Sequence, residues 1–83
     1  MECSKYIIFD SGGLDVPMVF SPLLEHAQVA SGIRLPILSA GFCALDSYEP
    51  FWETWGKSVS LGVSSRKHDG VLITQAIQKE MFV

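Results

Sequence analysis

Two cysteines and two histidines are the side chains of this chain that most readily hold a metal ion or supply a nucleophile and a base. They are Cys3, His26, Cys43 and His68, separated by intervals of 23, 17 and 25 residues. Zinc sites of small domains use ligand pairs a few residues apart, and none of these intervals is that short. No local segment places a nucleophile beside a base either. We therefore expect no metal, no cofactor and no catalytic residue, with Cys43 packed as a small apolar side chain.

A glycine-rich segment follows the first apolar run. Ser11-Gly12-Gly13-Leu14-Asp15 resembles the SGGxDS loop of the ATP pyrophosphatase families, in which backbone N–H groups surround pyrophosphate. Those enzymes need a far larger α/β domain. Val16 replaces the final serine of the motif, and Pro17 stands where the helix behind the loop should begin. We interpret the segment as the tight turn of a β-hairpin.

An aromatic segment in the second half is the sharpest feature of the sequence. The eight residues from Tyr48 to Trp55 include four of the nine aromatic residues of the chain. They could form a lid over one end of the core, because each large ring buries about 150–250 Å². They could instead present a binding surface, because Trp and Tyr are enriched at interaction hot spots. The candidate contact residues are Tyr48, Phe51, Trp52 and Trp55, with Trp52 and Trp55 as the leading anchors.

The only basic run is Arg66-Lys67-His68, just before the last predicted helix. With the N-terminal amides of that helix it could form a small anion site. The alternative is a solvated loop ahead of the helix cap. Arg66 and Lys67 complete the set of candidate site residues.

Hydrophobic periodicity predicts the elements that position these residues, in the order β-β-α-β-β-α. The strand signals lie at 6–9, 16–20, 37–45 and 58–64, and the helical stripes at 22–31 and 69–81. We predict an α+β fold in which one four-stranded antiparallel sheet carries both helices on one face. The second hairpin is longer than the first, and we interpret residues 46–57 as an aromatic-rich insertion into it.

Length and composition limit the class of protein. Eighty-three residues form a single domain, of which 48% are hydrophobic and only 18% charged, with a net charge of −3. The chain lacks the basic stripe of a duplex nucleic-acid reader, and its uncharged stretches are too short to span a membrane. No basic, apolar leader begins it, and two cysteines do not make a disulfide framework. We expect a cytoplasmic protein.

These features predict a non-catalytic module that binds another protein. Low charge and two free sheet edges also predict a homo-oligomer, most simply a two-fold dimer, with edge pairing as the first expected contact and the open sheet face as the second. Accessory proteins and inhibitors, including those that phages encode against host defences, are often small acidic domains of this kind.

Two alternatives stay open. One is a nucleotide- or small-ligand-sequestering protein, in which Trp52 or Trp55 stacks on a base while Arg66 and Lys67 hold a phosphate. The other is a small enzyme subunit whose active site is completed by an oligomer.

Overall fold

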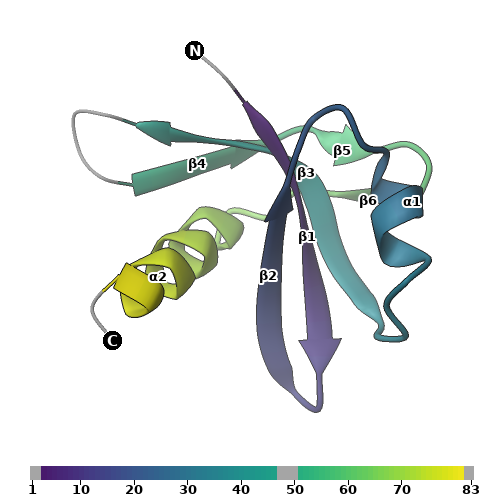
Figure 1. The fold of residues 1–83 in the computed structure, drawn as a ribbon, viewed down its shortest axis with the longest axis horizontal. Coiled ribbons are helices and arrows are strands. Elements are labelled where there is room, and N and C mark those ends of the chain that lie inside the picture. The colour runs from purple at the N-terminus through teal and green to yellow at the C-terminus, as the bar shows by residue number, and fades with distance from the viewer. Residues whose placement is uncertain (1–2, 47–50, 82–83) are drawn as a thin grey trace.

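A four-stranded antiparallel sheet with strand order β2-β1-β3-β4 forms the centre of the molecule (Figure 1). The computed structural model describes residues 3–46 and 51–81. All neighbouring strands of this sheet pair antiparallel. The predicted α+β class and the four-stranded antiparallel sheet are therefore confirmed. The strands are β1 (Ser4–Ser11), β2 (Leu14–Phe20), β3 (Ile37–Asp46) and β4 (Phe51–Trp55).

The glycine-rich segment is the turn of the β1–β2 hairpin, as predicted. Gly12 and Gly13 have φ angles of 61° and 90°. Two consecutive positive φ angles are what a two-residue type I′ turn requires, and glycine adopts them without steric cost. The Gly13 N–H also donates to Asp10 Oδ1 at 2.9 Å. This geometry accounts for the two glycines without a phosphate ligand.

The two helices lie on opposite faces of the sheet (Figure 1). Tyr6 and Ile8 of β1 pack with Ile73 of α2 (Asp69–Met81). The alternate residues of β1, Ile7 and Phe9, belong to a second cluster that includes residues of α1 (His26–Ala30). The prediction that both helices share one face is wrong. The unbroken apolar run at 6–9 indicates this arrangement, because a strand covered on both faces does not alternate between apolar and polar residues.

The fourth strand of the sheet lies inside the predicted insertion at 46–57. β4 pairs with β3 in a register that runs from Phe42↔Trp55 to Asp46↔Phe51. The alternating pattern at 58–64 instead forms a separate two-stranded ribbon of β5 (Lys57–Ser58) and β6 (Val63–Ser64). Aromatic residues and threonine also favour strands, so residues 51–55 were as suitable for the fourth strand as residues 58–64. Within the predicted insertion at 46–57, residues 51–55 therefore form the edge strand of the sheet, and residues 47–50 lie outside the described part of the chain.

The two helices differ in length. Helix α2 covers 13 residues at the predicted position, whereas α1 has only five and begins at His26, later than predicted. Glu25 and Gln28 form a capping box at the start of α1. Within the described residues, neither helix combines the length and the apolar character needed to cross a lipid bilayer.

Candidate functional site

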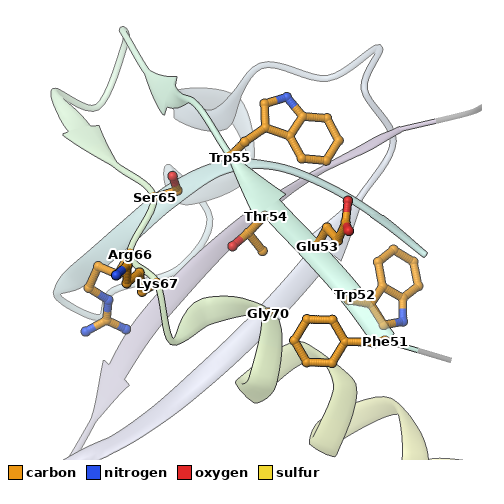
Figure 2. A pocket seen from close by; sticks show the side chains of 9 residues that line it. All are labelled: Phe51, Trp52, Glu53, Thr54, Trp55, Ser65, Arg66, Lys67 and Gly70. Atoms are coloured by element: carbon orange, nitrogen blue, oxygen red, sulfur yellow. The ribbon is translucent and has the colours of Figure 1, made fainter. Parts of the chain in front are cut away.

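A groove of about 620 Å³ lies between β4 and the segment that leads into α2 (Figure 2). Five of the six predicted contact residues line it, although they come from two separate parts of the sequence. The sixth, Tyr48, lies outside the described residues. Of the interpretations drawn from the sequence, only the nucleotide-binding alternative required the aromatic segment and the basic run to lie at one site. The lining residues are Phe51, Trp52, Glu53, Thr54, Trp55, Ser65, Arg66, Lys67 and Gly70.

The first turn of α2 closes one end of this groove. The Trp52 N–H donates to Thr74 Oγ1 at 2.9 Å, and the same hydroxyl donates to the Gly70 carbonyl at 2.7 Å. A Cβ atom at position 70 would collide with the Trp52 carbonyl oxygen. Glycine therefore allows the helix to approach the strand closely enough for these bonds. Gly70 was not among the predicted site residues, and a glycine in the first turn of a predicted helix was the available signal.

The two tryptophans of β4 project from opposite faces of the strand, because they are three residues apart. Trp52 is half-buried and packs on the core formed with α2. Trp55 stacks on Phe42 with ring centroids 6.4 Å apart and an interplanar angle of 23°. Trp55 and Phe51 remain 43% and 39% exposed. The aromatic segment is thus part lid and part accessible surface, and the two indoles cannot enclose one ligand between them.

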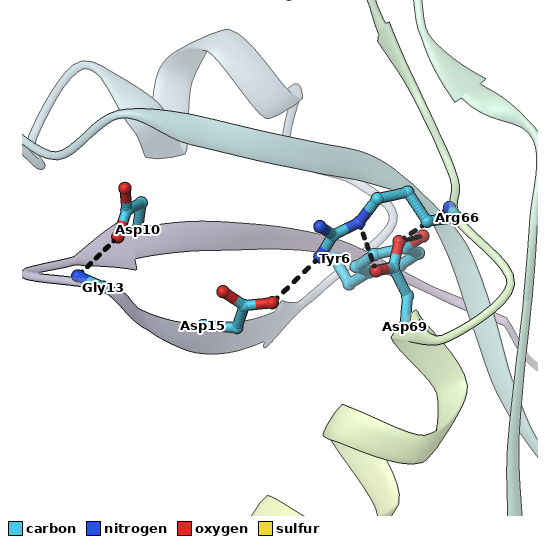
Figure 3. Close-up of polar contacts among 6 residues, drawn as sticks. All are labelled: Tyr6, Asp10, Gly13, Asp15, Arg66 and Asp69. Carbon is cyan, nitrogen blue, oxygen red and sulfur yellow. Dashed lines mark hydrogen bonds and ion pairs between the residues drawn. The ribbon is translucent and has the colours of Figure 1, made fainter.

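Arg66 forms ion pairs with two carboxylates, those of Asp15 and Asp69 (Figure 3). Its Nε donates to Asp69 Oδ1 at 3.0 Å, and its backbone N–H donates to Asp69 Oδ2 at 2.9 Å. Its Nη2 reaches Asp15 Oδ2 at 3.4 Å. Asp69 is fully buried and also accepts a hydrogen bond of 2.6 Å from the Tyr6 hydroxyl. This network ties the start of α2 to β1 and β2, and it offsets the positive charge of the guanidinium.

The protonation of Tyr6 fits its role as the donor in this network. Burial raises the pKa of Tyr6 well above its usual value, and the hydrogen bond and charge of Asp69 raise it further. The phenol therefore keeps its proton. Arg66 supplies the positive charge that a buried carboxylate requires, so the three side chains are mutually satisfied.

Lys67 is the cation of the groove that stays available. Its side chain is exposed, and its ammonium group makes no hydrogen bond or ion pair with the described residues. Figure 2 shows Glu53 on the other side of β4 from Arg66 and Lys67. The groove therefore has one positive rim and one negative rim.

Cys43 and His26 are both buried and packed against neighbouring residues. Burial, and secondarily the nearby Cys3, raises the pKa of Cys43 to about 12, so its thiol is a poor nucleophile at neutral pH. His26 is buried, with its Nε2 2.9 Å from the Gly41 carbonyl oxygen and its ring edge-on to Phe20 and Phe42. Among residues 3–46 and 51–81, no three His, Cys, Asp or Glu side chains gather closely enough to hold a metal ion.

Two uncharged polar residues, Thr54 and Ser65, also line the groove. Thr54 lies in the middle of the lining, between the aromatic residues and the basic run (Figure 2). Neither Thr54 nor Ser65 was predicted as a site residue, because uncharged polar residues carry no sequence signal of their own.

No protein-family model, no curated protein and no solved structure matches this chain, so its function is inferred from the geometry of the groove.

Proposed function

We propose that this chain is a small, non-catalytic module that binds another protein through the groove between β4 and α2. The observation that carries the proposal is the lining of that groove. Phe51 and Trp55 are 39% and 43% exposed and line it together with Lys67, whose ammonium group makes no hydrogen bond or ion pair with the described residues. Exposed large aromatic side chains are typical of interaction hot spots.

The nucleotide-binding alternative has less support. That alternative requires Arg66 and Lys67 together to hold the phosphate beside a single indole. Arg66 already neutralises Asp69 and contacts Asp15. Lys67 alone would then have to hold the phosphate, whereas phosphate sites usually combine several donors.

The test is a selection of linear peptides from a random display library on the folded protein. Binding would be mapped by the backbone amide resonances, which a chain of this size gives as a well-resolved NMR spectrum. We expect the selected peptides to shift the amides of residues 51–55 and 65–70. Nucleoside mono- and triphosphates, added separately, should leave those resonances unchanged.

Two variants provide the comparison. Phe51→Ser should weaken the selected peptides, because it removes an exposed ring from the groove. Leu23→Ser, at a position that is 92% exposed and outside the groove lining, should leave their affinity unchanged. The proposal fails if no peptide is selected, if the shifts fall on another surface, or if a nucleotide shifts the groove amides instead.

A further inference from the structure

The outer edge of β4 is closed at two positions and open at the one between them. At one end, the Trp52 N–H is bonded to Thr74, as described above. At the other, the Gly56 carbonyl accepts a hydrogen bond of 2.9 Å from the Ser65 N–H. In an antiparallel strand, residues two apart direct their N–H and C=O groups to the same side. Since Trp52 donates away from β3, Thr54 directs both of its backbone groups into the groove.

These two groups are unpaired within the described part of the chain. No backbone hydrogen bond is formed by Thr54 outside its strand, and its strand has only β3 as a neighbour. Its hydroxyl is turned towards Tyr6 instead. The groove therefore exposes one donor and one acceptor at the spacing with which a β-strand recognises another peptide chain.

The space for such a chain is limited to about one residue. A strand added along the whole of β4 would have to displace Thr74 at one end and Ser65 at the other. A bound segment can instead pair with Thr54 alone and leave the edge on both sides. The ligand that fits is thus a short extended stretch of polypeptide.

Charge indicates which side chain the segment carries next to the pairing residue. Lys67 forms the free positive rim beside Thr54, and Glu53 lies on the other side (Figure 2). A carboxylate placed near Lys67 gains an ion pair and is kept away from Glu53. We infer that the groove binds an extended segment of a partner protein through a single antiparallel bridge to Thr54, with an acidic side chain beside Lys67.

This inference rests on the proposed function, and peptides that bind at the groove are its probe. Each backbone N–H of a selected peptide would be replaced in turn by N-methyl. We expect one methylated position to lower affinity about tenfold, since one hydrogen bond is lost and a methyl group enters the contact. Losses at alternate positions along the peptide would indicate a full added strand and would overturn the single bridge.

Two substitutions at Thr54 test the protein's side of the bridge. Thr54→Pro removes the N–H that faces the groove, whereas Thr54→Val keeps it and removes only the hydroxyl. We expect the proline variant to weaken the peptide about tenfold and the valine variant to bind normally. If the proline variant does not fold, the N-methyl series on the unchanged protein decides. Equal weakening by both variants contradicts the bridge.

Lys67→Glu tests the charge preference. It should weaken peptides with an acidic residue beside the bridge and favour peptides with a basic residue there when the selection is repeated. An unchanged selection would overturn the acidic assignment. Peptides that shift the groove amides but show no sensitive N-methyl position would refute the bridge and leave the proposed function standing. No peptide at the groove would refute both.

Discussion

At the scale of single residues, the basic run divides into a structural and an accessible member. Arg66 holds the buried Asp69 and Lys67 faces solvent, although the two are neighbours in sequence. Sequence reasoning treated them as equivalent parts of one anion site. It could not separate them, because Asp69, the partner of Arg66 three residues along the chain, is buried against Tyr6, which lies 63 positions away in sequence.

Arg66→Gln should therefore destabilise the protein. The substitution leaves the carboxylate of Asp69 buried without its ionic partner, and we expect a loss of about 2 kcal/mol in the free energy of unfolding, because the guanidinium is partly exposed. The matched variant Lys67→Gln should change it by less than about 0.5 kcal/mol. Urea titration of both variants measures the difference. Equal stabilities would contradict a structural role for Arg66.

At the scale of elements, β4 combines a core-facing and an accessible side within five residues. Trp52 packs on the cluster that contains Tyr6 and Ile73, whereas Trp55 lies on the other side against Phe42. The strand thus helps to close one core and supplies exposed aromatic surface to the groove. This division resolves the two interpretations of the aromatic segment, because each applies to a different tryptophan.

Replacing each tryptophan should separate these roles. Trp52→Ala should cost about 3 kcal/mol or more of stability, since it opens a cavity beside Ile73. Trp55→Ala should cost about 1 kcal/mol, because that ring is 43% exposed and loses mainly its stacking on Phe42. Thermal or urea unfolding of the two variants measures both values. A larger loss for Trp55 than for Trp52 would reverse the assignment.

Local signals predicted some elements well and others poorly. The type I′ turn and helix α2 depend on nearby residues, namely the two glycines and the helical stripe at 69–81. The choice of the fourth strand depends on long-range pairing, and both 51–55 and 58–64 had suitable residues. β3 could accept only one partner at that edge, and the aromatic segment pairs there. Period-two alternation identifies a half-buried strand but does not say which sheet it joins.

At the scale of the whole molecule, the predicted contacts between copies must be revised. The pair that flanks a two-residue turn exchanges backbone hydrogen bonds, and such pairs then alternate along the hairpin. Pro17, opposite Ile8, is therefore placed with its nitrogen towards the free edge of β2. A proline at that position removes the donor that a second strand would need. With the outer edge of β4 open at Thr54 alone, neither edge favours pairing along its length, and each face of the sheet carries a helix.

A stripe of side chains on β2 is the surface that still favours self-association. Leu14, Val16 and Met18 are 70%, 40% and 37% exposed, and their register places them on the same face as Ile7 and Phe9. Alternate residues of a strand form a continuous row, so the three side chains make one apolar strip. A second copy related by a two-fold axis would cover the strip with its own, because such an interface uses the same patch twice. Homo-oligomerisation thus stays a prediction, with side-chain packing in place of edge pairing.

Val16→Lys tests this arrangement, because it places a charge at the centre of the strip without changing the strand's backbone. We expect the unchanged protein to give a dimer mass by light scattering at micromolar concentrations, and the variant to give a monomer mass. Leu23→Lys serves as the control, since Leu23 is 92% exposed and lies outside β2. A monomer mass for the unchanged protein throughout that range would contradict the prediction. A dimer that persists in Val16→Lys would place the contact elsewhere on the surface.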